Sequence, residues 1–332
     1  MTVTPVAVGS SAMETSAQTA ARLRRILLGQ NVLLVVALGL LVLFLTLRLE
    51  FFFTTTNLLT IVQFSSVTFI VATGFTLVLI GGGLDLSIGS GMMMTGVVSG
   101  KLFVAGVPLV LAFTIGFLVG GVTGLANGLI ITKLRINPLV ATLAMLFVLQ
   151  GTGFIITDGR HTQVRDDGFR FARERLFDIP VPVYFLVFTA VVSVILLRTT
   201  KVGRHLFAVG GNPEAARQAA MNVDRFRLGM YVVAGLYTGL AGVILASLLG
   251  SIAPNSGTGR EFAVATAVFL GGASLTGGKG SIVGTLIGVL FVTTLANGLI
   301  QLAVVPDWVM VIEGILLIVA VAFDQRPKGG FR

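Results

Sequence analysis

A glycine-rich break with a single carboxylate interrupts the apolar sequence near residue 85. Hydrophobic segments flank residues 81–90 on both sides. In lipid every backbone N–H and C=O needs a partner within the protein, so irregular backbone survives at membrane depth only inside protein or beside a water-filled cavity. The break is therefore a candidate re-entrant or gating loop, although Asp85 could equally serve as the N-cap of the next helix. Its candidate residues are Gly81, Gly82, Gly83, Asp85, Ser87 and Gly89.

A second glycine-rich segment, residues 270–281, resembles a phosphate-binding loop at first sight. It fails that pattern, because Ala273 stands where the first glycine belongs and Gly280 replaces the Ser or Thr that would bind magnesium. We therefore expect no cofactor in this chain, and any ATP and Mg²⁺ would be bound by a partner. The segment is instead a second candidate gating loop, with candidate residues Gly271, Gly272, Gly277, Gly278 and Lys279.

Three polar side chains lie within apolar segments and are candidates for a transport pathway. A carboxylate such as Glu313 is costly at membrane depth and needs a reason. As a proton-coupling group it would support an ion-coupled secondary transporter of a small polar solute, whereas a hydrogen-bonded Glu313 at a helix or subunit contact would be structural. We favour the structural interpretation, which predicts that glutamine is tolerated at this position. Asn127 and Asn297 could line a polar path or make interhelical hydrogen bonds.

The composition determines the class of protein that must position these residues. With 55% hydrophobic residues, 11% charged residues and a mean hydropathy of +0.98, the chain is an integral membrane protein and not a soluble globular domain. It has no cysteine, and its two histidines lie in predicted loops, which argues against a metal site. Apolar segments predict an all-α polytopic protein with about ten membrane spans, at 32–47, 58–80, 88–104, 107–132, 138–157, 181–198, 228–250, 262–276, 281–304 and 307–323.

The distribution of charge predicts the topology. A cytoplasmic N-terminus places most basic residues, including Arg22, Arg24 and Arg25, on the inside, whereas acidic and basic residues balance on the outside. This is the positive-inside pattern, so the net charge of +9 reflects topology and not nucleic-acid binding. We predict a multi-pass protein of the bacterial inner membrane, in contact with lipid, with both termini cytoplasmic. It comprises a disordered tail at 1–31, a transmembrane domain at 32–325 and a short tail at 326–332.

An internal repeat predicts the arrangement of the spans. The hexapeptide Leu-Ala-Asn-Gly-Leu-Ile occurs at residues 125–130 and again at 295–300. Because the first copy would run inward and the second outward, two five-span halves would be related by inverted topology, which is typical of transporters. Chance identity among common membrane residues is the alternative. The glycine-rich loops near residues 81 and 271 do not align at the same offset, so the predicted repeat is incomplete.

The longest inside loop, residues 199–227, carries the signals of a helix start. Asn212 suits the N-cap, Pro213 the first helical position and Glu214 the first turn. A helix of about nine residues should follow, and it would be too short to be stable alone in water. We expect this helix to dock on another protein or on the loops of its own chain.

The longest outside loop, residues 158–180, has a balanced mixture of charges. Such a surface suits the docking of a soluble protein, because complementary charges steer encounter and set register. A solvated loop without a partner is the alternative. The charged residues are Arg160, Arg165, Arg170, Arg173 and Arg175, with Asp158, Asp166, Asp167, Glu174 and Asp178.

Three motifs taken together resemble a known family. The chain resembles, over roughly residues 30 to 325, the membrane-spanning permease subunits of bacterial ATP-binding-cassette importers of the ribose, xylose and galactose type. The resemblance rests on residues 82–90, on Gly203 and Arg204 with residues 208–217, and on Glu261 with residues 270–281. It departs at Ala220 and Met221, where relatives usually have glycine and isoleucine.

The resemblance implies a function and a set of partners. It implies a transmembrane subunit of an ATP-driven monosaccharide importer, with ATP hydrolysis in a separate ATPase subunit, a periplasmic sugar-binding protein at the outside loop, and a second permease subunit. No set of residues suits a membrane enzyme, so the chain is expected to be a transport subunit. The residues that would couple it to the ATPase are Gly203, Arg204, Gly210, Gly211, Asn212, Pro213, Glu214, Ala215, Ala216 and Arg217.

Overall fold

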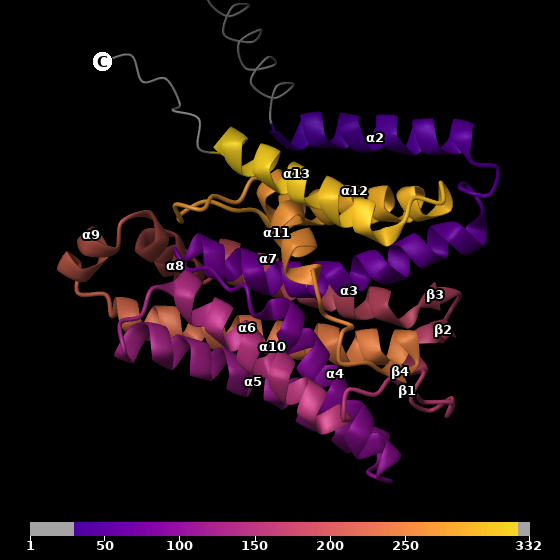
Figure 1. The fold of residues 1–332 in the computed structure, drawn as a ribbon. Helices are drawn as coiled ribbons and strands as arrows, with labels where there is room; N and C mark the ends of the chain where they lie inside the picture. The colour runs from indigo at the N-terminus through magenta and orange to yellow at the C-terminus, as the bar shows by residue number, and fades with distance from the viewer. Residues whose placement is uncertain (1–29, 325–332) are drawn as a thin grey trace, which may run out of the picture.

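The computed structural model describes residues 30–324, which form an almost wholly helical protein (Figure 1). Nearly all of the predicted N-terminal tail, with Arg22, Arg24 and Arg25, and the C-terminal tail at 326–332 lie outside the described residues. The helices are α2 (Gln30–Arg48), α3 (Thr55–Ile80), α4 (Ile88–Val104), α5 (Leu109–Lys133), α6 (Pro138–Thr157), α7 (Val181–Thr199), α8 (Lys201–Gly211), α9 (Pro213–Gln218), α10 (Val223–Leu249), α11 (Arg260–Leu270), α12 (Ile282–Gln301) and α13 (Pro306–Asp324). The short elements are β1 (Thr162–Gln163), η1 (Phe171–Arg173), β2 (Arg175–Leu176), β3 (Ile179–Pro180) and β4 (Ser251–Ile252).

Each of the ten predicted spans overlaps a helix, but not every helix can cross a membrane. Seven helices of the described chain are long and apolar enough to do so, namely α2, α3, α5, α6, α7, α10 and α12. The predicted span at 262–276 has the wrong ends, because the helix found there is α11 (Arg260–Leu270). The 11 residues of α11 reach only about 16 Å, roughly half of a 30 Å hydrocarbon core. It ends at Leu270 because the glycines that follow leave the helical path, with Gly272 at φ +89°.

The loops gather at two ends of the helical bundle (Figure 1). One end, here the α9 face, holds α8, α9 and the loops at 81–87 and 271–281. The other end, here the β face, holds the strands, where β1 pairs with β4 in antiparallel register through Thr162 and Ile252. The α9 face holds the loops that the sequence predicts to lie inside, and the β face holds the long loop that it predicts to lie outside. The orientation of the termini in a membrane stays a prediction.

The helices α3 and α10 form the buried centre of the bundle. Most of their spanning residues are buried, and both helices pack on each other and on several neighbours. Glycines allow the closest approaches, since a side chain on Gly120 would collide with the backbone of Gly235, and one on Gly124 with the carbonyl oxygen of Tyr231. Where lipid supplies no hydrophobic drive, such backbone contact is what holds helices together.

The order of the helices fits the predicted inverted repeat. A shift of 170 residues carries the ranges of α3, α4, α5 and α6 onto positions that overlap α10, α11, α12 and α13. Packing follows the same relation, since α4 packs on α6 as α11 packs on α13. The helix α3 ends at the α9 face, whereas α10 ends at the β face, so the halves run in opposite directions. The counterpart of the loop at 81–87 is thus the loop after β4, and not the loop at 271–281.

Candidate functional site

Three glycine-rich segments that are distant in sequence meet at the α9 face. We name this contact the glycine junction and define it as Gly81–Gly83, Gly210–Gly211 and Gly277–Gly278. The backbone N–H of Gly278 donates to the carbonyl oxygen of Ile80 at 2.8 Å. A methyl group on Gly210 would collide with that same oxygen. The junction joins the end of α8 directly to both predicted gating loops.

Backbone conformation at the glycine junction also demands glycine. Gly82, Gly277 and Gly278 have φ values of +74°, +82° and +69°, which are strained for residues with a side chain. The sequence motif that mimics a phosphate loop is therefore used here for a tight turn. Lys279 follows that turn with an exposed side chain. Asp324, the last residue of α13, accepts hydrogen bonds from Ser274 Oγ at 2.9 Å and from the Leu275 N–H at 3.1 Å.

The inside loop contains one more helix than expected. Residues 201–211 form α8, whereas the sequence predicts a loop there. Thr200 caps this helix, since its Oγ1 accepts from the N–H of Gly203 at 3.1 Å. Gly203 is buried, and a side chain there would collide with backbone carbonyl oxygens at the end of α7, so the position requires glycine. Arg204 is exposed. The helix α8 thus turns directly off α7 and carries its C-terminal glycines into the glycine junction.

The second helix of this loop starts where the sequence predicts. The Asn212 side-chain oxygen accepts from the N–H of Ala215 at 3.0 Å, and Pro213 is the first helical residue. The predicted length of about nine residues was wrong, because α9 has six. It ends where Ala220 adopts φ +59°, and the Ala220 and Met221 N–H groups donate back to carbonyl oxygens of α9.

The helix α9 projects from the protein with little of its surface covered. Only Ala216 is buried, in a small apolar cluster with Val209 and Val223. Glu214 and Arg217 form an exposed ion pair at 3.3 Å, which contributes little to stability. Ala215 is also exposed. A helix this short, resting on one small cluster, has most of its surface free for a partner.

The carboxylate of Asp85 organises the loop that precedes α4. The suggestion that Asp85 is the N-cap was wrong, because Ser87 holds that position and makes no side-chain capping bond. Instead Asp85 Oδ1 accepts from the Ser87 N–H at 2.9 Å and from Ser87 Oγ at 2.6 Å. Burial raises the pKa of the Asp85 carboxyl, and the hydrogen bonds from Ser87 and Asn127 act in the opposite direction.

The two asparagines of the repeat occupy different surroundings. Asn127 is buried, and its side-chain N–H donates to Ser87 Oγ at 2.8 Å, so it ties α5 to the loop before α4. Asn297 is half-buried and donates to the side-chain oxygen of Asn57 at 2.9 Å, which joins α12 to α3. Both side chains therefore make contacts between helices in this structure. A role in lining the pathway stays a prediction.

Two helix N-termini meet near the middle of the bundle. A side chain on Gly257, in the loop before α11, would collide with the carbonyl oxygen of Gly89, in the first turn of α4. Helix α4 runs from this point to the β face, where Gly100 contacts Ile252, and α11 runs to the α9 face. Discontinuous helices that present their N-termini at mid-depth are a feature of transporter binding sites.

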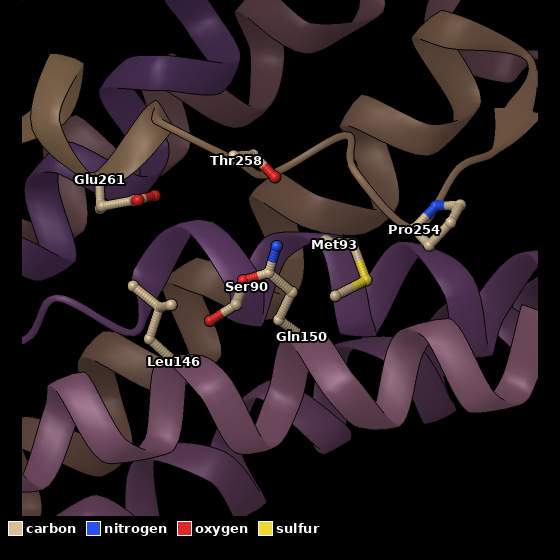
Figure 2. A pocket seen from close by; sticks show the side chains of 7 residues that line it. All are labelled: Ser90, Met93, Leu146, Gln150, Pro254, Thr258 and Glu261. Carbon is tan, nitrogen blue, oxygen red and sulfur yellow. The ribbon is translucent and has the colours of Figure 1, made fainter. Parts of the chain in front are cut away.

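A small cavity of about 20 Å³ adjoins this meeting point. Figure 2 shows Glu261 and Thr258 on one side of it, with Ser90 from α4 and Gln150 from α6 across from them. Glu261 is only 6% exposed; its Oε1 accepts from the Gly259 N–H at 3.3 Å, whereas its Oε2 has no partner among the described residues. In the sequence Glu261 stands out only as part of a motif, and nothing there marks Gln150 as a site residue.

The loop at 158–180 folds onto the β face. Arg173 donates from Nε to the carbonyl oxygen of Leu248 and from Nη2 to that of Leu249, both at 2.8 Å. These carbonyls end α10, where a cation is favoured. Arg170 donates from Nε to the Val164 carbonyl oxygen at 3.0 Å. Two of the five arginines therefore have a structural role, which the prediction of a docking surface did not foresee, while Arg165 and its neighbours Asp166 and Asp167 are exposed.

Glu313 lies on α13 beside a larger cleft at the β face. Its side chain has no hydrogen bond within the described chain, and its backbone oxygen accepts from Thr266 Oγ1 at 3.4 Å. Arg260 at the start of α11 lies close enough to interact electrostatically with the Glu313 carboxylate. Glu313 thus lies beside a cleft and forms no ion pair with any residue of 30–324.

Comparisons with known proteins agree on a transport role. Residues 57–321 match the family described as branched-chain amino acid transport system / permease component. The chain is 36% identical over 282 residues to the ribose import permease protein RbsC of Escherichia coli (strain K12), covering 83% of this chain and 88% of that protein. It is 38% identical over 275 residues to RbsC of Bacillus subtilis (strain 168), covering 82% and 85%.

A third relative has a different sugar in its name. The L-arabinose ABC transporter permease protein AraH of Azospirillum brasilense is 39% identical over 255 residues, which cover 74% of this chain and 73% of that protein. No solved structure matches the chain significantly.

Proposed function

The chain belongs to the family described as branched-chain amino acid transport system / permease component, and from this we propose that it imports a monosaccharide as the transmembrane subunit of an ATP-driven transporter. It is a multi-pass protein of the inner membrane, with seven apolar helices of spanning length among its described residues. The family description mentions amino acids, but the relatives named above carry sugars in their names and match most of both chains. They favour a sugar as the substrate.

The main structural support for the mechanism is the series of contacts that leads from α9 through α8 to both predicted gating loops. The helix α9 is exposed, and α8 beside it ends in the glycine junction with the loops at 81–87 and 271–281. We propose that a separate ATPase subunit, which binds ATP and Mg²⁺, docks on α9 and moves α8. Because the junction is made of backbone contacts, movement of α8 would pass to the loops that end α3 and α11. Alternating access of the pathway would follow.

Two further partners complete the proposed transporter. A periplasmic sugar-binding protein would dock on the exposed charges of the loop at 158–180, without Arg170 and Arg173, which are already bound to backbone carbonyls. A second permease subunit, identical or paralogous, would form the other half of the pathway. Large apolar side chains exposed on α13, among them Trp308 and Ile318, leave that helix free to face lipid or this subunit.

The proposal is tested at Arg217. Arg217→Glu reverses an exposed charge on α9, and Arg225→Glu makes the same change at an exposed site on the same face outside α9. We expect Arg217→Glu, and deletion of residues 212–221, to reduce both co-purification of the ATPase and ATP-driven sugar uptake. The Arg225→Glu control should retain both.

Two outcomes would contradict the proposal. Full ATPase binding and uptake by the 212–221 deletion would remove α9 as the docking element. Sugar uptake by the purified chain with no ATPase present would instead identify an ion-driven transporter.

A further inference from the structure

The cleft at the β face has the size and polarity of a ligand site. It encloses about 430 Å³ between the loop before α11, the first turns of α11, the end of α12 and the first half of α13. Ligand sites in proteins typically enclose about 300–1,000 Å³. Its polar lining comes from Asn255, Ser256, Thr258, Arg260 and Glu313. The cleft is therefore large enough for a monosaccharide, whereas the small cavity beside Glu261 is not.

Arg260 and Glu313 face this cleft with unused hydrogen-bonding capacity. A guanidinium has five N–H donors, and within the described chain only Nε of Arg260 has a partner, the Ser256 carbonyl oxygen at 2.8 Å. The Glu313 carboxylate accepts no hydrogen bond from a described residue. The two groups attract each other electrostatically, yet they do not form an ion pair. Space between opposite charges of this kind can be filled by a ligand.

The charges select the class of ligand. Since Arg260 and Glu313 have no net charge together, they favour a ligand without net charge, either a neutral molecule or a zwitterion, and within that class the proposed function of sugar import selects the sugar. A sugar hydroxyl can donate to a carboxylate and accept from a guanidinium at the same time. The side chains of Asn255, Ser256 and Thr258 add groups of the same kind.

The position of the cleft suits a pathway. Glu313 lies seven residues into α13, roughly 10 Å from its start at the β face. Thr258 lines both the cleft and the small cavity beside Glu261. The monosaccharide-sized cleft therefore lies next to a water-sized cavity, beside the point where the N-termini of α4 and α11 meet.

We propose that this cleft is a monosaccharide-binding station in the translocation pathway, where Arg260 and Glu313 bind hydroxyl groups of the sugar. The inference rests on the proposed function of sugar import, and it assigns to Glu313 the binding of a neutral substrate. Glutamine can still bind a hydroxyl, whereas leucine cannot. Glu313→Gln should thus retain most transport, and Glu313→Leu should lower the number of sugars moved per ATP hydrolysed by about tenfold.

A labelling experiment tests occupancy without relying on loss of function. The chain has no cysteine, so Ser256→Cys introduces a single thiol in the cleft. The purified complex with its ATPase and binding protein would be treated with a small charged methanethiosulfonate reagent during ATP turnover, with and without sugar. The sugar would be the one that the wild-type complex takes up from a panel that includes D-ribose and L-arabinose. Glu50→Cys, exposed in the loop before α3 and outside both the cleft and the loop at 158–180, is the control.

Sugar should slow labelling of Ser256→Cys several-fold and leave the labelling rate of Glu50→Cys unchanged. The proposal is overturned if sugar leaves the rate at Ser256→Cys unchanged, or if added phospholipid protects that site and sugar does not. It is also overturned if Glu313→Leu transports as well as wild type, or if Glu313→Gln abolishes uptake together with proton dependence. Failure of the wild-type complex to import any sugar of the panel would instead overturn the proposed function itself.

Discussion

Replacing Gly210 with alanine tests whether the glycine junction connects α8 to the membrane helices. The added methyl group would collide with the carbonyl oxygen of Ile80 and lie 2.8 Å from the amide nitrogen of Gly278. Those two atoms form the hydrogen bond that closes the junction. Backbone atoms cannot move aside as a flexible side chain can, so the alanine variant must separate α8 from one or both loops.

The expected cost follows from the contacts that are lost. Breaking the hydrogen bond costs about 1 kcal/mol, and forcing a methyl group into a packed site costs about 1–3 kcal/mol. Alanine recovers about 1 kcal/mol because it favours helix more than glycine does. The net destabilisation for Gly210→Ala is therefore about 1–3 kcal/mol. Gly211→Ala is a matched control in the next position, because its added methyl group would have no neighbour within 4 Å.

The assay compares stability and coupling in the purified transporter. Gly210→Ala should lower the midpoint of thermal inactivation and the number of sugars moved per ATP, because α8 would no longer press on both loops. Gly211→Ala should retain both values or gain slightly in stability. If Gly210→Ala matched Gly211→Ala in midpoint and coupling, the junction would not be the connection between α8 and the loops.

Three further substitutions test local features of the same regions. Ala220→Gly should stabilise the protein by about 0.5 kcal/mol, measured as a higher inactivation midpoint, because the left-handed conformation at φ +59° favours glycine. Asn212→Ala should lower the stability of the protein by about 1 kcal/mol and weaken ATPase binding, because the α9 cap is lost, whereas Asn212→Asp should retain the cap. Equal ATPase binding by the two variants would contradict this. Arg173→Met should cost about 1 kcal/mol, since it removes two hydrogen bonds to the end of α10; an unchanged midpoint would show that these bonds add nothing.

Features that depend on local chemistry were predicted well from the sequence. The Asn212 cap and the Pro213 start of α9 follow from rules that act within one turn, and the structure confirms both. The end of α9 was missed because nothing in the sequence marks Ala220 as left-handed. Apolar periodicity located the helices, but it could not separate the half-length α11 from a complete span, since its flanking glycine-rich segment is also apolar.

Features that depend on tertiary contact were out of reach of the sequence. The segments of the glycine junction are separated by more than sixty residues from one another, and glycine has no side chain whose pattern could indicate a partner. From the sequence, Arg173 is expected to be an ordinary surface charge. Only the structure shows that α10 ends beside it. The cleft with Arg260 and Glu313 unites residues from α11 and α13, which only the packing of these helices brings together.

The close backbone contact between Gly89 and Gly257 would link the two ends of the proposed pathway. The first turn of α4 and the loop after β4 are reached from opposite faces, and they approach so closely that a side chain on either glycine would collide with the backbone oxygen of the other. Such a contact is stiff, so a push on one loop is also a displacement of the other. In the proposed alternating-access mechanism, an opening on the α9 face would therefore also move the backbone beside the β-face cleft. Two separate gates would need to be coordinated, whereas one shared contact would close one end as it opened the other.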